Sequence, residues 1–109
     1  MDTLRFLTHE NLEQIKMEFQ TPTFVYDEAI LRANAQAVKQ FPNAFGLNAR
    51  YAMKAAPTSA IIRIIHDEGL GIDASSGFEV ERAVRAGMGT ESISLSTQEF
   101  PEQFKYWVQ

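Results

Sequence analysis

The chain has 109 residues, of which 45% are hydrophobic and 22% charged, so its composition is that of a globular domain and excludes disordered and collagen-like chains. Its net charge of −4 provides no electrostatic footprint for nucleic acid or for an anionic membrane surface. With no cysteine, this sequence cannot form disulfides, a thiolate zinc site or a cysteine nucleophile. Without a recognisable signal segment, metal-ligand cluster or membrane span, we expect a soluble cytoplasmic protein that binds small molecules.

The first predicted elements are a peripheral helix, a short strand and a second helix. Three apolar residues share a helical face within residues 1–21, namely Leu12, Ile15 and Phe19. The β-branched and aromatic run 23–26 is typical of a strand, and Asp27 is a suitable N-cap for the helix that follows. The predicted apolar stripe of that helix consists of Ile30, Ala33, Ala37, Val38 and Phe41.

The rest of the chain alternates strands and helices. Residues 44–55 alternate apolar and polar side chains, which predicts a strand that ends near Lys54. An isoleucine-rich helix follows and ends at Gly69, and further strands are predicted over residues 70–74 and 92–96. Between these two strands we expect a helix that begins at the capping box Ser76 to Glu79 and ends near Gly87. A last helix, expected from Pro101, has Phe104, Trp107 and Val108 on one face.

The spacing of these elements predicts an α/β fold with parallel strands. The successive strands end near Lys54, Asp73 and Leu95, and a single helix separates each pair. Right-handed crossovers of this kind build either a barrel, with its helices on one face, or an open sheet covered on both faces. In both architectures ligands bind at the carboxyl ends of the strands, where Lys54 and Asp73 are expected.

Lys54 is the ionisable residue best suited to covalent chemistry. It follows a strand and precedes Ala55-Ala56-Pro57, which offers no charged neighbour. Poor solvation favours the neutral amine over the ammonium ion, and a neutral amine can form a Schiff base with an aldehyde cofactor or a carbonyl substrate. On the pattern alone, the commoner interpretation is a lysine that simply reaches water.

The residues after the next strand also admit two interpretations each. Asp73 is suited to orienting an amine or holding a proton, although an aspartate in this position more often serves a turn or cap. Ser75, Ser76 and Gly77 place hydroxyl and N–H groups at a helix start, which suits an anion or a plain N-cap. Glu79 is by pattern a capping-box partner.

Four motifs, in order and with matching spacing, carry a resemblance to a known family. They are residues 21–27, residues 31–34, Tyr51-Ala52-Met53-Lys54-Ala55, and the run from Gly71 through Glu79 to Gly87. Together they resemble the start of the diaminopimelate decarboxylases, which belong to the ornithine, diaminopimelate and arginine decarboxylase group of pyridoxal phosphate enzymes. The resemblance covers residues 21 to about 97.

The resemblance implies an activity and a role for each candidate residue. Lys54 would hold pyridoxal 5'-phosphate covalently and act as the catalytic residue, while Asp73 and Glu79 would lie near the lysine and cofactor, with Ser75 a weaker neighbour. The implied reaction is decarboxylation of an amino acid, with meso-diaminopimelate converted to L-lysine. Ornithine, arginine and carboxynorspermidine-type substrates stay open, and so does a non-catalytic cofactor-binding or regulatory fragment.

The resemblance also implies an architecture. Residues 1–26 would form an N-terminal helix and strand partly associated with a second, β domain, and residues 27–109 the first βα units of a cofactor-binding (β/α)8 TIM barrel. The phosphate loop, the ring-stacking histidine, the acid facing the pyridine nitrogen and a cysteine motif donated across a homodimer would lie beyond residue 109. We therefore expect the 109-residue stretch alone to be inactive and to expose apolar surface and a sheet edge.

Overall fold

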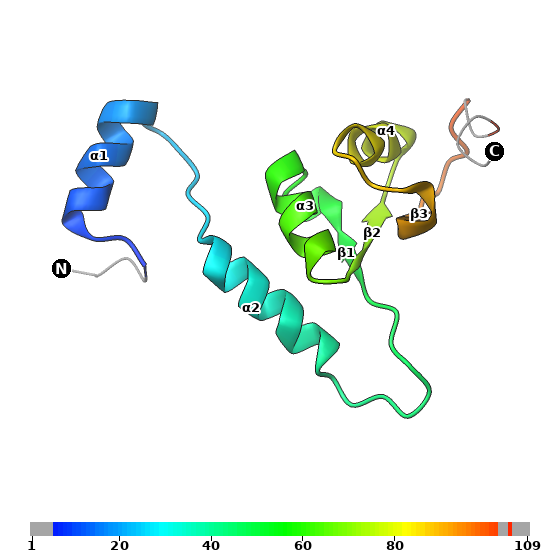
Figure 1. The fold of residues 1–109 in the computed structure, drawn as a ribbon. Helices are drawn as coiled ribbons and strands as arrows, with labels where there is room; N and C mark the ends of the chain where they lie inside the picture. The colour runs from blue at the N-terminus through cyan, green and yellow to red at the C-terminus, as the bar shows by residue number, and fades with distance from the viewer. Residues whose placement is uncertain (1–5, 103–104, 106–109) are drawn as a thin grey trace.

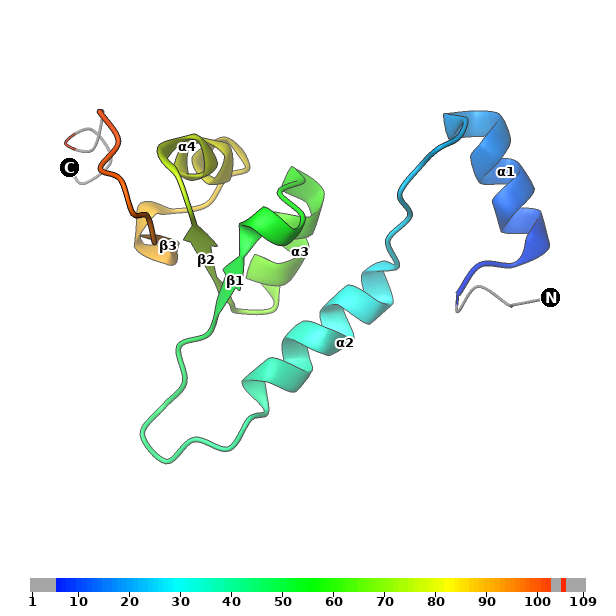
Figure 2. The same cartoon turned by 180° about the vertical axis from the view of Figure 1, so that it is seen from behind.

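The computed structural model describes residues 6–102 and Lys105 (Figure 1). Helix α1 (His9–Phe19) stands apart from the sheet, at the end of an extended segment (Figure 1 and Figure 2). The elements that follow are α2 (Glu28–Lys39), β1 (Arg50–Ala52), the 3₁₀ turn η1 (Met53–Ala55), α3 (Ser59–Asp67), β2 (Gly71–Ala74), α4 (Gly77–Arg85), the 3₁₀ turn η2 (Thr90–Ser92) and β3 (Ile93–Leu95).

The three strands form one parallel sheet in the order β1-β2-β3. Its register pairs Ala52 with Asp73, and Asp73 with Ser94. Helices α3 and α4 lie side by side against the same face, because side chains of both pack on Ile72 and Ala74 of β2 (Figure 1 and Figure 2). The predicted α/β class with parallel strands is confirmed. Sequential strand order with helices on one face occurs in barrels and in one half of a doubly wound sheet.

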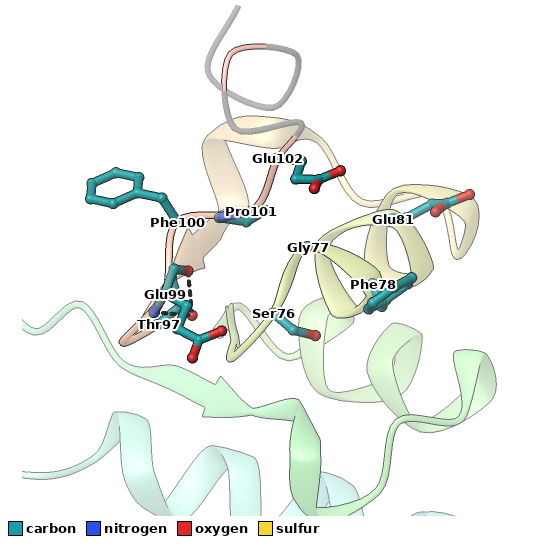
Figure 3. Close-up of a pocket in the computed structure, with 9 residues that line it drawn as sticks. All are labelled: Ser76, Gly77, Phe78, Glu81, Thr97, Glu99, Phe100, Pro101 and Glu102. Carbon is teal, nitrogen blue, oxygen red and sulfur yellow. Dashed lines mark hydrogen bonds between the residues drawn. The ribbon is translucent and has the colours of Figure 1, made fainter.

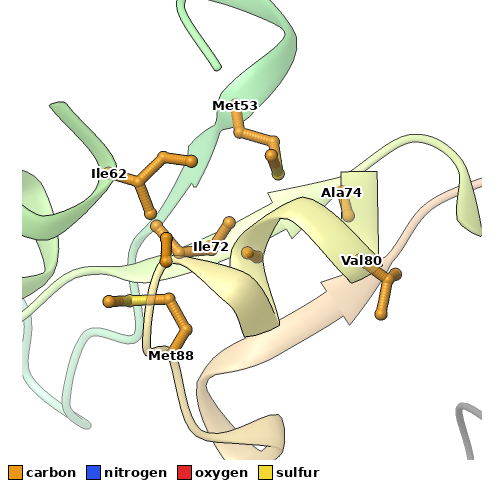
Figure 4. Close-up of a cluster of buried hydrophobic side chains, with 8 residues drawn as sticks. Met53, Ile62, Ile72, Ala74, Val80 and Met88 are labelled. Carbon is orange, nitrogen blue, oxygen red and sulfur yellow. The ribbon is translucent and has the colours of Figure 1, made fainter. Parts of the chain in front are cut away.

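The core lies between β2 and the two helices. Its largest fully buried side chains are those of Met53, Ile62 and Ile72 (Figure 4). The cluster is completed by Ala74, Val80, Ala83, Ala86 and Met88. A second, smaller cluster joins α2 to α3 and contains Ala35, Ile61, Ile65 and Leu70. Because η1 contributes Met53 to the larger cluster, the backbone next to Lys54 is anchored in the core.

The helix ends follow their local sequence signals. The Asp27 carboxylate accepts a hydrogen bond from the backbone N–H of Ile30 at 2.9 Å, which caps α2 as predicted. Gly69, after α3, has φ of +91°, and Gly87, after α4, has φ of +95°. Both are left-handed conformations that glycine adopts without strain, so the predicted helix ends are confirmed.

Two strand predictions are wrong. Residues 23–26 are extended but belong to no strand, and Phe24 is 90% exposed. Strand formation needs a partner for its backbone ladder, and no described strand pairs with this run. In the predicted strand 44–55, only Arg50–Ala52 is a strand, and η1 follows it. Its length is limited by β2, which has four residues and pairs with three of β1.

The predicted apolar stripe of α2 is also wrong. Ile30, Val38 and Phe41 are 43%, 44% and 68% exposed, whereas Ala35 is buried and packs in the α2–α3 cluster with Leu31. Helix α2 turns the face of Leu31 and Ala35 to α3, because polar contacts between the two helices lie beside these residues. The final predicted helix face, Phe104, Trp107 and Val108, lies outside the described residues.

These polar contacts centre on Arg32. Its guanidinium Nη1 lies 2.8 Å from Glu68 Oε1 and its Nη2 lies 2.7 Å from Glu28 Oε1. Gln36 donates a further hydrogen bond of 3.0 Å to Glu68. The hydrogen bond from Arg32, followed by that from Gln36, lowers the pKa of Glu68 below its ordinary value of 4.5. The two helices are thus joined by charge-assisted hydrogen bonds beside their apolar contact.

We expect this contact to make the stability of the protein depend on pH at the acid end. A carboxyl group whose pKa is lowered by folding stabilises the folded state above its unfolded value, here near 4.5, and loses that contribution as pH falls through the folded pKa. Urea denaturation at a series of pH values should therefore show that Glu68→Gln flattens the acid limb of the midpoint profile. Glu18→Gln, on the exposed surface of α1, is the control that should leave the limb unchanged.

The sheet face opposite the helices carries a side chain that crosses it. Arg50, on β1, donates a hydrogen bond of 3.0 Å from Nη1 to the backbone carbonyl of Ser92, next to β3. It passes over Gly71 of β2, where an added Cβ would lie 2.8 Å from Arg50 Nη1 and 3.1 Å from the Ser92 carbonyl oxygen. Glycine at position 71 therefore provides the space that the arginine occupies.

Candidate active site

The carboxyl edge of the sheet gathers the sequence-predicted residues. Lys54 lies in η1, directly after β1, and Asp73 is the penultimate residue of β2. Ser75 follows β2 and leads into α4, which contains Glu79. Because β1 and β2 are parallel and pair Ala52 with Asp73, both strands end at the same edge of the sheet. The structure thus brings these four residues to one edge of the sheet.

The Lys54 side chain is exposed, so the expectation of poor solvation is not met in this structure. Among the described residues, none forms an ion pair or hydrogen bond with its amine. The reason for the exposure is local: in the 3₁₀ turn Met53 takes the buried position, and Lys54 takes the solvent-facing one. The amine is therefore accessible to an aldehyde or carbonyl group.

The turn that carries Lys54 is held on both sides. Met53 is fully buried in the core, and the Tyr51 hydroxyl donates a hydrogen bond of 3.2 Å to the backbone carbonyl of Ala56. Burial raises the pKa of Tyr51 above its ordinary value of 10.0. Backbone on either side of Lys54 is thus anchored even though its amine is in solvent.

Asp73 is held by two serines of the neighbouring strand segment. Ser94 donates to Asp73 Oδ1 at 2.8 Å, and Ser96 donates to the same oxygen at 2.7 Å. Neither serine was predicted from the sequence as a functional residue. The signal that could have identified them is a pair of hydroxyl residues two apart in a strand, which places both on one face of the sheet.

Ser75 and Glu79 form a separate local pair. Glu79 Oε2 accepts hydrogen bonds from the Ser75 backbone N–H at 2.7 Å and from its hydroxyl at 2.9 Å. Ser76 caps α4 by accepting from the Glu79 backbone N–H at 3.2 Å, as predicted. The other half of the capping box differs, since the Glu79 carboxylate reaches Ser75 instead of the N–H of Ser76. This pair orders the loop between β2 and α4.

A cleft of about 440 Å³ opens beside the start of α4 (Figure 3). One wall is formed by α4 and the other by the segment after β3. Its lining combines aromatic and acidic side chains with the α4 N-terminus, and consists of Ser76, Gly77, Phe78, Glu81, Thr97, Glu99, Phe100, Pro101 and Glu102. The cleft thus adjoins the loop that Ser75 and Glu79 order.

The chemistry of these groups suits an aldehyde cofactor that carries an amino acid. An accessible primary amine is the group that reacts with an aldehyde, and carboxylates nearby in the fold suit a cationic amine. Within residues 6–102 and Lys105, no three histidine, aspartate or glutamate side chains are grouped as metal ligands. None of the described helices is long and apolar enough to cross a membrane.

Comparison with known proteins agrees with this chemistry. The family model described as "Pyridoxal-dependent decarboxylase, pyridoxal binding domain" matches residues 28–104. Diaminopimelate decarboxylase of Escherichia coli strain K12 is 37% identical over 86 residues, which are 79% of this chain and 19% of that protein. Its counterpart from Bacillus subtilis strain 168 is 41% identical over 78 residues, 70% of this chain and 18% of that protein.

The chain thus spans about a fifth of the length of these curated relatives. The matched region begins at the first residue of α2 and contains every strand of the sheet, together with Lys54, Asp73, Ser75 and Glu79. On this match, the chain belongs to the pyridoxal-binding domain family of the pyridoxal-dependent decarboxylases.

Proposed function

We propose that the protein which carries this segment is a pyridoxal phosphate-dependent amino-acid decarboxylase, a lyase that converts meso-diaminopimelate to L-lysine. The observation that carries the proposal is the accessible amine of Lys54 at the carboxyl edge of a parallel sheet, inside a domain that matches the pyridoxal-binding family. The substrate is proposed from the relatives, which are named diaminopimelate decarboxylases. Such a protein contributes to lysine biosynthesis.

Each residue has a proposed role in this reaction. Bound pyridoxal phosphate would supply an electron-withdrawing ring system that stabilises negative charge at the substrate α-carbon. Lys54 would hold the cofactor through its amine until the amine of the substrate takes its place. The Lys54 amine freed in this way, in its protonated form, would be the group placed to deliver a proton to the α-carbon after the bond to the carboxylate breaks and carbon dioxide leaves. Asp73 orients a cationic amine at the same edge. Glu79, through Ser75, keeps the adjoining loop ordered.

The proposal extends to the architecture around the site. Residues 27–109 are the first βα units of a (β/α)8 barrel, which the sequential strand order and the one-sided helices support. Residues 1–26 would associate partly with a second, β domain. We further propose a cytoplasmic homodimer, since the motifs resemble those of homodimeric soluble enzymes. The exposed apolar residues of α2 and of the preceding segment, such as Ile30 and Phe24, agree with a chain that has further surface to cover.

Carbon dioxide release with candidate substrates tests the proposed reaction. The protein that carries this segment is incubated with pyridoxal phosphate and, in separate samples, with meso-diaminopimelate, ornithine, arginine and carboxynorspermidine. We expect release of carbon dioxide and formation of L-lysine with meso-diaminopimelate at a rate at least tenfold above the other three. A higher rate with another of the amines would keep the reaction and overturn the substrate. Cofactor binding without turnover of any amine would favour a regulatory module.

A further inference from the structure

We infer that Ser94 and Ser96 are positioning residues that fix the carboxylate of Asp73 at the carboxyl edge, so that one of its oxygens is available to a cationic amine. The inference rests on the proposed function for the identity of that amine. Its structural basis is the geometry of three side chains on the sheet face opposite α3 and α4. Nothing in the family match or in the named relatives assigns either serine.

The two serines bind a single oxygen. Ser94 Oγ lies 2.8 Å and Ser96 Oγ 2.7 Å from Asp73 Oδ1, and in both contacts the hydroxyl donates to the carboxylate. A carboxylate oxygen has two lone pairs, so two donors occupy the hydrogen-bonding capacity of Oδ1. Among the described residues, none donates a hydrogen bond to Asp73 Oδ2. The second oxygen is therefore left for a donor that enters the site.

The backbone makes this arrangement rigid. Ser94 and Asp73 are register partners in the parallel sheet. The backbone N–H of Ser96 donates to the carbonyl of Ala74 at 2.8 Å, which continues the ladder beyond the end of β3. Both hydroxyls thus come from positions two apart on backbone that is paired with the strand of Asp73. Groups held by paired strands are placed more accurately than groups on loops.

Another acceptor is available to Ser94, but it is farther away. The backbone carbonyl of Ile72 lies 3.5 Å from Ser94 Oγ, at the limit of hydrogen bonding, whereas Asp73 Oδ1 lies at 2.8 Å. Since a hydrogen bond to a charged acceptor is also stronger than one to a neutral carbonyl, the Asp73 contact decides the orientation of the hydroxyl. The neighbouring lysine, Lys54, is two residues beyond Ala52, the register partner of Asp73 on β1.

The experiment compares Ser94→Ala, Ser96→Ala and the double variant with Ser92→Ala and with Ser96→Thr. Ser92 is the matched control, because it precedes Ser94 by two residues and its hydroxyl makes no hydrogen bond with any described residue. Ser96→Thr keeps the hydroxyl and serves as the conservative rescue. Two readouts are used: the NMR three-bond couplings that report the Asp73 χ1 rotamer without cofactor, and the dissociation constant for pyridoxal phosphate from its visible absorbance.

We expect a single Asp73 rotamer in the unsubstituted protein, in Ser92→Ala and in Ser96→Thr, and rotamer averaging in the double variant. Cofactor affinity should fall about tenfold in the double variant. Without the two serine hydroxyls, the Asp73 carboxylate would no longer be held for its charge-assisted hydrogen bond to the cationic amine, and one such bond is worth on the order of this factor. Unchanged Asp73 couplings in the double variant would overturn the inference. If the couplings change but the unsubstituted protein binds no pyridoxal phosphate, the positioning of Asp73 stands and the proposed function fails.

Discussion

Replacement of Lys54 by alanine is expected to abolish covalent binding of pyridoxal phosphate. The Lys54 amine is exposed and free of ion pairs among the described residues, so it is the group at the carboxyl edge that can react with the cofactor aldehyde. Without it, the visible absorbance of the bound cofactor should be lost, and borohydride reduction should leave no cofactor mass on the peptide that contains position 54. Decarboxylation should fall by about 10³-fold or more, as expected when a group that moves a proton is removed.

Lys16→Ala is the matched control for this experiment. Lys16 is an exposed lysine of α1 whose ammonium lies 3.7 Å from Glu13, and it is remote in sequence from the sheet edge. We expect its replacement to leave both the absorbance and the reduced adduct unchanged. A cofactor adduct that persists on another lysine in Lys54→Ala would show that Lys54 is not the attachment site.

The largest loss of stability is expected from Ile72→Ala. Ile72 is in the middle strand, is fully buried and packs between α3 and α4 in the larger core cluster. Truncation of such a side chain removes apolar contacts and leaves a cavity that paired strands cannot close, which costs about 2–5 kcal/mol. Denaturant titration followed by circular dichroism should show this decrease in the free energy of unfolding.

Phe45→Ala provides a comparison for Ile72→Ala. Phe45 is as hydrophobic but is completely exposed, at 102% of its reference area, in the loop before β1. Its replacement should change the free energy of unfolding by less than about 0.5 kcal/mol, the usual range for surface positions. Equal losses for the two variants would mean that burial on this sheet does not determine stability.

Local sequence signals predicted the helix ends and the alternation of strands and helices well. Asp27 and Ser76 cap their helices, and Gly69 and Gly87 end theirs, because each of these effects depends on a few consecutive residues. The order of βα units then followed, since single-helix crossovers connect parallel strands.

Features that depend on distant partners could not be predicted in the same way. The run 23–26 has strand-forming residues but pairs with no described strand, so propensity alone misled the assignment. The buried face of α2 was misassigned because Arg32 pairs with Glu68, 36 residues away, and this contact turns Leu31 and Ala35 toward α3. The hydrogen bond from Ser94 to Asp73 depends on the register of β2 and β3, which cannot be derived from local sequence.

Arg50, which crosses over Gly71, and Asp73 separate positive from negative charge along the sheet face opposite the helices. Arg50 and Gly71 form one register row, and Asp73 lies two residues further along β2, which is about 6–7 Å in a strand. The positive charge is therefore on the side where the strands begin, and the negative charge is on the side where they end. Along the strands, the charges of Arg50 and Asp73 thus form a dipole whose negative end lies at the edge that carries Lys54.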